Sequence, residues 1–420
     1  MNKKISNILV AFLLIIGVAW RIQNCFRLNI WSDESSSLYT SEGSLKGTWE
    51  KSIYHEHQSP PYFLILNLWR RINSSIGFSR LLSSIFSVLS IFFIYKTWTY
   101  LFGNKWKFIA PLVYTFNSFH LWAASEARVY AAVILLCAAS TYYFFKISMH
   151  IEEQHKISDY FLYFLWAILG IYTFYPFGFF ILGHFLVALI WLKRKELRAM
   201  VLCYILMGVS LIFWLPILKI HFLYSISWPD THKRGVDFII AESKFIKDLI
   251  LAFTPFYQFA KSVIYIPNPS IIAKIFIIVI FYGMLTLLLA TRFLFERKKP
   301  TIEEKILMAT IITPFLSLAV LHFLDLGVSN VRYYAITSII SLFFIVMAYN
   351  IKNGTFRKLL VGFIIIILLV SSIWHELKNP KAKLSSQENY FVSFVSLNRQ
   401  IDFFLGRLIG GENGAKSPQP

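Results

Sequence analysis

Long apolar segments recur along the whole chain, and each is close to the length of a membrane-spanning helix. A helix needs roughly 20 mostly apolar residues to cross the hydrocarbon core, with about 17 as a lower limit. Eleven segments meet or approach that length: residues 5–20, 80–100, 108–124, 130–147, 158–175, 177–192, 199–218, 270–291, 306–324, 334–351 and 358–374. With 57% hydrophobic residues, the 420-residue chain exceeds what a water-soluble core could bury. The sequence predicts an all-α polytopic membrane protein.

Basic residues in the short loops indicate how the chain threads through the membrane. The formal net charge is +19, but the basic residues are scattered between apolar segments and form no arm typical of nucleic-acid binding. If the amino terminus is cytoplasmic, alternate loops are densely basic, as the positive-inside rule requires. These loops carry Lys96, Lys105, Lys107, Lys146, Lys156, Lys193, Arg194, Lys195, Arg198, Arg292, Arg297, Lys298, Lys299, Lys305, Lys352, Arg357 and Lys358. We therefore expect a multi-pass protein of the cell (inner or plasma) membrane, with residues 5–20 as a retained signal anchor and with no nucleic-acid partner.

One apolar run, residues 61–69, is too short to cross the membrane and ends at Arg70 and Arg71. It predicts a re-entrant or surface-lying helix, because counting it as a span would move most basic loops to the outer side. The resulting organisation has these bounds: 1–374 for a membrane domain, 21–79 and 219–269 for its two long outer loops, and 375–420 for a short polar tail that also lies outside.

Three polar clusters interrupt the apolar sequence, and this threading puts all three on the outer side. They are Asp33-Glu34, Glu126-Ala-Arg128-Val-Tyr130 and Arg332-Tyr333-Tyr334. Ionisable side chains near a bilayer lose hydration and are normally kept where they pair, bind a metal or move protons. We expect the three clusters to converge on one extracytoplasmic site.

Asp33 and Glu34 follow the first apolar segment, where it should leave the membrane. A carboxylate there can take the proton from an acceptor hydroxyl as a general base, or hold a divalent cation. Both residues are candidates for catalysis. The alternative is that one of them caps a helix that begins near Ser35 and stabilises its positive end.

Two arginines accompany these acids. Arg332, next to Tyr333, opens an apolar segment, and a guanidinium matches the geometry of a phosphate. The alternative is an interfacial anchor, since Arg and Tyr both favour that depth. Arg128 lies near Glu126 and Tyr130. It either forms a buried ion pair that fixes helix packing or orients a carboxylate of the first loop.

His55-Glu56-His57 is a weak candidate for a metal site. Two histidines at i and i+2 share one face only on a strand. The alternative is a polar loop on the membrane surface. His221 and His232 could complete a metal site, although nothing in the sequence requires one. The sequence establishes no cofactor, and it leaves open whether the protein binds a divalent metal ion.

Taken in order, these segments resemble the membrane-embedded GT-C glycosyltransferases, specifically the protein O-mannosyltransferase-like and aminoarabinose-transferase-like group (family 39 type). The resemblance covers most of the chain and is firmest from Trp31 to about Lys146. The matching segments are Trp31-Ser-Asp-Glu34, Ser59-Pro-Pro-Tyr62, Phe78-Ser-Arg-Leu-Leu-Ser-Ser84, Ala124-Ser-Glu-Ala-Arg-Val-Tyr130 and Arg332-Tyr333.

The resemblance implies a GT-C-type bundle with surface-lying helices in its first outer loop. It also implies transfer of a sugar from a polyprenyl-phosphate donor to an extracytoplasmic glycan, lipid or protein acceptor. The residues implied for the site are Asp33 and Glu34 for catalysis, Arg332, Tyr333 and Arg128 for the donor phosphate, and Glu126, Tyr130 and His57 in support.

The chain departs from the family in two places. Ser59 stands before the two prolines where relatives often have His, and the segment 172–176 has an aromatic residue where relatives often carry another His. The sugar and the acceptor therefore stay undetermined. The alternative function is a polytopic transporter or lipid-carrier flippase, but such a protein should place its charges near the bilayer midplane and often contains inverted repeats.

Overall fold

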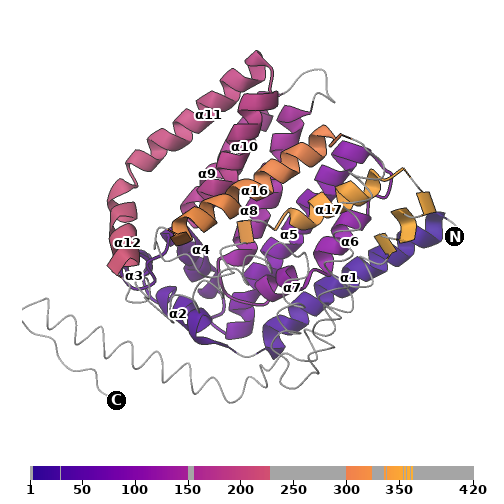
Figure 1. The fold of residues 1–420 in the computed structure, drawn as a ribbon. Helices are drawn as coiled ribbons and strands as arrows, with labels where there is room; N and C mark the ends of the chain where they lie inside the picture. The colour runs from indigo at the N-terminus through magenta and orange to yellow at the C-terminus, as the bar shows by residue number, and fades with distance from the viewer. Residues whose placement is uncertain are drawn as a thin grey trace, which may run out of the picture.

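In the computed structural model, every regular element of the described residues is a helix (Figure 1). The structure describes residues 3–28, 30–149, 156–227, 299–323 and most of 335–362. The helices are α1 (Lys3–Arg27), α2 (Ser32–Thr40), α3 (Leu45–Tyr54), α4 (Pro60–Arg70), α5 (Ile76–Phe102), α6 (Ile109–Thr115), α7 (Ser118–Ala124), α8 (Tyr130–Ser148), α9 (Ile157–Thr173), α10 (Phe177–Trp191), α11 (Arg194–Ile212), α12 (Leu215–Ser227), α16 (Ile302–Phe323) and α17 (Ile340–Tyr349). The predicted all-α fold is confirmed.

The predicted spans mostly coincide with helices, with two exceptions where one span is broken into two. The segment 108–124 is interrupted at Asn117, whose side-chain oxygen accepts hydrogen bonds from the backbone amides of Phe119 and His120 and so caps a new helix. The segment 199–218 bends by 70° between α11 and α12. The segment 270–291 and nearly all of 358–374 lie outside the described residues.

Two described helices, α5 and α8, are long and apolar enough to cross a membrane by themselves, and α11 with α12 could form a third, bent span. The short helix predicted over 61–69 is present as α4, with Pro60 in its first turn. Proline is tolerated there because backbone amides in the first turn of a helix have no hydrogen-bond partner within the helix.

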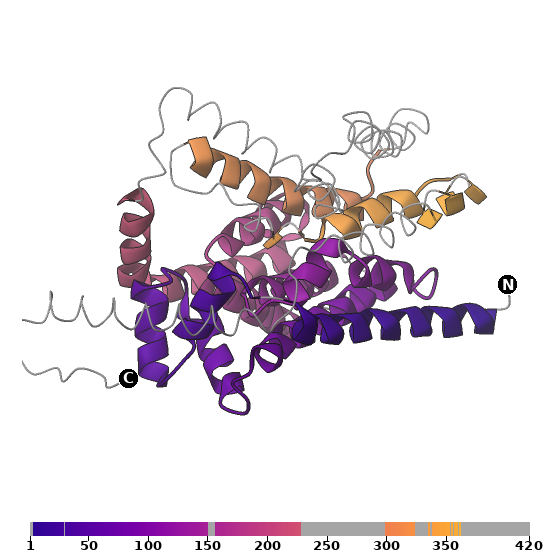
Figure 2. The ribbon, with the colours of Figure 1, turned by 90° about the horizontal axis from the view of Figure 1, so that it is seen from below.

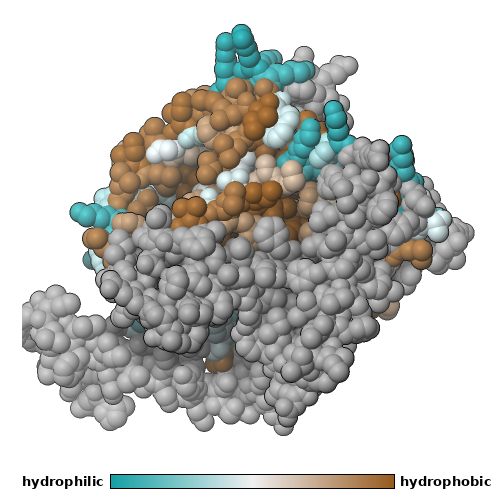
Figure 3. All heavy atoms as spheres, viewed as in Figure 1, coloured by the Kyte–Doolittle hydropathy of each residue, from teal (hydrophilic) through white to brown (hydrophobic). Residues whose placement is uncertain are grey.

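The surface of α5 has a pattern suited to lipid rather than to water. Its buried face carries Ser79, Ser83, Ser87 and Ser90, and its exposed face carries Ile85, Val88, Leu89 and Phe92. Small residues let neighbouring helices approach closely inside a membrane bundle, while apolar side chains face the acyl chains. Figure 3 shows the same apolar character over α10, α11 and α16, with polar residues where α10 turns into α11.

The bundle has two chemically different ends. At one end, α2, α3, α4 and the bent α12 gather around the starts of α5 and α8 (Figure 1). At the other end, the Tyr100 hydroxyl on α5 donates to the carbonyls of Lys146 and Met149 at the end of α8. The Arg357 guanidinium lies over the Trp106 and Tyr349 rings. The described acidic motifs therefore share one end, and the described basic loops lie at the opposite end.

Helices α16 and α17 form a layer on one side of the bundle, opposite α1 (Figure 2). This layer depends on a close approach at Gly183 of α10. A Cβ added at Gly183 would lie 2.9 Å from the Thr310 Cα and 3.2 Å from the Ala309 carbonyl oxygen, both on α16. Because the obstacle is backbone, the helices would have to separate.

We expect Gly183→Ala to lower the free energy of unfolding by about 1–3 kcal/mol, the usual cost of overpacking. Gly208→Ala on α11 is the matched control, because a Cβ there meets nothing within 4 Å. Thermal unfolding of both variants in the same detergent measures the difference. Equal midpoints for the two variants would contradict the close approach.

Candidate active site

The two acids of the first loop occupy different environments in the first turn of α2. Glu34 is fully buried, whereas Asp33 is half-buried. Consecutive residues on a helix point about 100° apart, so the pair cannot share one environment. Glu34 and Asp33 therefore each have their own contacts.

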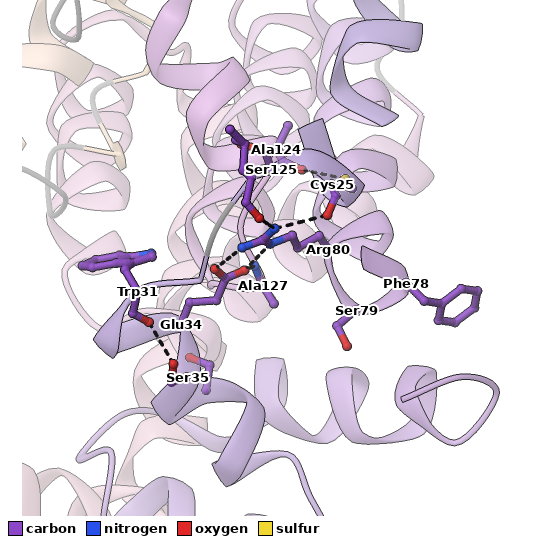
Figure 4. Close-up of polar contacts among 12 residues, drawn as sticks. Cys25, Trp31, Glu34, Ser35, Phe78, Ser79, Arg80, Ala124, Ser125 and Ala127 are labelled. Carbon is purple, nitrogen blue, oxygen red and sulfur yellow. Dashed lines mark hydrogen bonds and ion pairs between the residues drawn. The ribbon is translucent and has the colours of Figure 1, made fainter. Parts of the chain in front are cut away.

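Glu34 forms a two-pronged ion pair with Arg80 of α5 (Figure 4). Arg80 Nε lies 2.6 Å from Glu34 Oε1 and Arg80 Nη2 lies 2.7 Å from Glu34 Oε2, and both side chains are 0% exposed. The backbone amide of Ala127 also donates to Glu34 Oε1 at 2.9 Å. Arg80 Nη1 donates to the carbonyls of Cys25 and Leu28 at the end of α1.

This pair connects the end of α1, the start of α2, the start of α5 and the loop before α8. Such a guanidinium–carboxylate fork has strict geometry, so it aligns the segments that it joins. Both Glu34 oxygens accept hydrogen bonds from Arg80, and Oε1 also accepts one from the Ala127 amide. These contacts suit a residue that positions the site, and a catalytic role of Glu34 stays a prediction.

Arg128 comes from the loop between α7 and α8 and contacts the first loop at several points. Its Nη1 donates to the Asp33 carbonyl at 2.8 Å and to Ser37 Oγ at 2.6 Å, and it lies 3.4 Å from Glu56 Oε1. The Arg128 and Glu56 side chains are only 5% and 6% exposed. Burial lowers the pKa of Arg128, but Glu56, Tyr130 and Asp33 outweigh it and raise the pKa above its ordinary value.

These contacts favour one of the sequence-based alternatives for Arg128, that it orients a carboxylate of the first loop. That carboxylate is Glu56, which the sequence suggested only as a metal ligand. Only Nη1 makes these contacts, so the assignment of Arg128 to the donor phosphate stays a prediction.

The remaining supporting residues lie close by. Glu126 is fully buried, and its charge acts on the Arg80 guanidinium. Tyr130 is 5% exposed, and the Arg128 guanidinium carbon lies 5.9 Å from the centre of its ring. Tyr62 of α4 is 1% exposed and reaches the same charged cluster, where Glu34, Glu126 and Arg128 all act on its hydroxyl.

The geometry of His55, Glu56 and His57 does not fit a metal site. Among the described residues, no group of three or more His, Cys, Asp or Glu side chains is arranged to hold a metal ion. His57 stacks on Tyr224 with ring centres 3.3 Å apart and lies 6.3 Å from the His221 ring. Burial, with smaller contributions from His221 and His55, lowers the pKa of His57 to about 4, so its ring is neutral at pH 7. His232 lies outside the described residues.

Aromatic and backbone contacts dock the first loop onto the bundle. Trp49 of α3 packs edge-on against Trp214 with ring centres 5.5 Å apart, and His221 Nε2 donates to the Ile53 carbonyl at 3.1 Å. The Ser59 hydroxyl donates to the Tyr172 carbonyl at the end of α9. The first loop is thus attached at both ends of the segment that carries Glu56.

The sequence-based interpretation missed Arg80 and Ser37 as site residues. An arginine among serines near the start of an otherwise apolar helix is a usable signal, because a lipid-exposed arginine would be costly there. Ser37 carries no comparable signal. Arg332 and Tyr333, predicted to bind phosphate, lie outside the described residues.

Comparisons with known proteins identify the fold. No protein-family model matches the chain, and no curated protein sequence matches it significantly. The crystal structure of ArnT from Cupriavidus metallidurans bound to undecaprenyl phosphate matches with a TM-score of 0.54 and 14% identity over 85% of this chain and 63% of that chain. The apo structure of the same ArnT has a TM-score of 0.42 and 11% identity over 87% of this chain and 78% of that chain.

This chain is therefore a membrane protein that shares the GT-C fold of the ArnT structure. The match confirms the GT-C fold that the motif resemblance predicts. The chain spans 63% of the length of the undecaprenyl-phosphate-bound ArnT structure.

Breaking the Glu34–Arg80 pair should destabilise the protein. Arg80→Met leaves a buried, unpaired carboxylate, which typically costs about 3–5 kcal/mol, whereas Glu34→Gln/Arg80→Met should lose less than Arg80→Met alone. Denaturant unfolding in detergent micelles measures both. Lys46→Met is the control, since the Lys46–Glu50 pair is exposed. If Arg80→Met is as stable as Lys46→Met, the Glu34–Arg80 pair does not hold the four segments together.

Proposed function

We propose that this protein is a membrane glycosyltransferase that moves a sugar from a polyprenyl-phosphate donor to an acceptor outside the cytoplasm. The observation that carries the proposal is the arrangement around Asp33. Its carboxylate belongs to a helix turn held by two buried guanidinium–carboxylate pairs, Glu34–Arg80 and Glu56–Arg128, in a GT-C fold. Such support is typical of a group whose direction matters, because a catalytic side chain must be held within a fraction of an ångström.

In the proposed reaction, Asp33 acts as the general base. It accepts the proton of an acceptor hydroxyl while the hydroxyl oxygen forms a bond to the anomeric carbon of the sugar. The bond between that carbon and the phosphate oxygen breaks, and the polyprenyl phosphate leaves with the electron pair. One base and one good leaving group suffice for a single displacement that inverts the anomeric centre.

Arg332 and Tyr333 are the proposed partners of the donor phosphate. A guanidinium stabilises charge that grows on the departing phosphate, and this interaction strengthens in the transition state. The resemblance of Arg332-Tyr333 to the late motif of the family supports this role. The related ArnT structure contains undecaprenyl phosphate, which makes a C55-type lipid phosphate a reasonable first probe.

We also propose that the site faces the outer side of the cell membrane. The acidic motifs share one end of the bundle and the basic loops the other, and the positive-inside rule assigns the basic end to the cytoplasm. A lipid carrier fits this location, since nucleotide sugars are cytoplasmic whereas a flipped lipid phosphate can present a sugar outside. The acceptor is then a glycan, lipid or protein of the cell envelope.

Asp33→Asn should lower transfer by about 10²-fold or more, since general base catalysis typically contributes that much. The assay uses purified protein, undecaprenyl phosphate carrying a hexose, pentose or aminopentose, and a panel of envelope acceptors. The matched control is Glu42→Gln, just beyond the other end of α2. Transfer by Asp33→Asn at the wild-type rate would remove Asp33 from the mechanism.

Arg332→Gln should weaken the binding of undecaprenyl phosphate by at least tenfold, whereas Asp33→Asn should leave it within threefold of wild type. Losing a charged hydrogen-bond partner of a phosphate costs about 1.5–3 kcal/mol. Native mass spectrometry or tryptophan fluorescence titration in detergent provides the measurement. An Arg332→Gln protein that binds like the wild type would make Arg332 an interfacial anchor.

A further inference from the structure

A polar network beneath Asp33 joins two parts of the first loop to the loop before α8. Arg128 Nη1 contacts the Asp33 carbonyl, Ser37 Oγ and the Glu56 carboxylate. The Ser37 hydroxyl also lies 3.3 Å from the Asp33 carbonyl and 3.5 Å from Glu56 Oε1. Gln58 Nε2 donates to Glu56 Oε2 at 3.2 Å. Glu56 is therefore held on both oxygens.

The start of α2 lacks the usual local support, and this network holds it together with a second distant contact, the Glu34–Arg80 pair. The residue before the helix is Trp31, whose side chain makes no capping hydrogen bond. A helix without a side-chain cap leaves its first turn free to fray. Arg128 does not replace that cap, because it donates rather than accepts, but it ties the first turn to a distant segment through the Asp33 carbonyl and Ser37 Oγ.

Arg128 in turn depends on Glu56. The Arg128 side chain is 5% exposed, and a buried guanidinium is costly without a carboxylate nearby. Glu56 is its ion-pair partner at 3.4 Å. Without Glu56, the arginine would be driven to turn toward water or toward another acid, and it would release the Asp33 carbonyl.

We propose that Glu56 is a positioning residue that holds Arg128 against the first turn of α2 and so sets the direction of the Asp33 carboxylate. The proposal rests on the proposed function in one respect, the use of Asp33 as the base. It gives the His55-Glu56-His57 segment a role other than metal binding. Glu56 acts through Arg128, and it contacts neither the donor nor the acceptor.

The first test measures position without any substrate. Hydrogen–deuterium exchange of peptides covering residues 31–41 should accelerate several-fold in Glu56→Gln, while peptides from α5 and α8 keep their wild-type rates. Glu50→Gln is the matched control, since Glu50 lies on α3 only six residues earlier and pairs with the exposed Lys46. Unchanged exchange over residues 31–41 in Glu56→Gln would overturn the proposal.

Ser37→Ala provides a second variant if Glu56→Gln exchanges faster everywhere, which would indicate general unfolding. This change removes the hydroxyl that bridges Arg128, Glu56 and the Asp33 carbonyl, but it leaves both charges paired. Its effect should again be confined to residues 31–41. Wild-type exchange there in Ser37→Ala would count against the network as the support of α2.

The second test is kinetic and uses whichever undecaprenyl-phosphate sugar the wild type transfers. A base displaced by about 1 Å can cost 10²-fold in rate. We expect Glu56→Gln to lower kcat by about 10–100-fold and to leave the donor KM within threefold. A raised donor KM with an unchanged kcat would show that Glu56 serves donor binding, which contradicts the proposal.

A combined variant separates positioning from general stability. If Glu56 acts through Asp33, adding Glu56→Gln to Asp33→Asn should not lower the residual rate further, because residues that act as a unit are not additive. If Glu56→Gln lowers the rate of the Asp33→Asn protein by the same factor as it lowers the wild-type rate, the proposal is overturned.

The two proposals fail in different ways. If Asp33→Asn is inactive but Glu56→Gln behaves like Glu50→Gln, the positioning role fails and the proposed function stands. If Asp33→Asn retains the wild-type rate, the catalytic role of Asp33 fails, and the exchange measurement still decides whether Glu56 holds α2.

Discussion

The buried ion pair between Glu34 and Arg80 is the interaction on which the arrangement of the candidate site depends. It joins α1, α2, α5 and the loop before α8 through one guanidinium and one carboxylate, both fully removed from solvent. A charge pair in this environment adds little net stability compared with apolar residues, but it imposes a definite geometry. What the pair provides is the alignment of four segments that approach one another from different parts of the chain.

The contrast between Glu34 and Asp33 illustrates how two adjacent acids acquire different roles. Both belong to the first turn of α2, and the sequence makes both of them candidates for catalysis, with Asp33 the stronger. The helix directs Glu34 into the bundle, where Arg80 and the Ala127 amide satisfy it, and leaves Asp33 half-buried beside Arg128. Burial therefore gives two adjacent carboxylates different surroundings.

The two places where the sequence departs from the motifs that it resembles are in contact with each other. They are Ser59 and the segment 172–176, and the Ser59 hydroxyl donates to the Tyr172 carbonyl. Near them, Trp214 Nε1 donates to the Tyr175 hydroxyl, and Trp49 packs on Trp214. A set of aromatic and backbone contacts thus docks the first loop here.

The sequence by itself determined the class of protein, the approximate bounds of most described helices and the short helix α4, because hydrophobic length and periodicity are local properties. It also singled out Asp33, Glu34, Glu126 and Arg128, because charges are costly in an apolar chain. Only the tertiary structure decided which residues form ion pairs. Glu34 pairs with Arg80, 46 residues away, and Glu56 pairs with Arg128, 72 residues away. It also decided that Asn117 breaks a predicted span. Partner choice depends on which helix faces meet, and that is set by packing over the whole bundle, which no local pattern encodes.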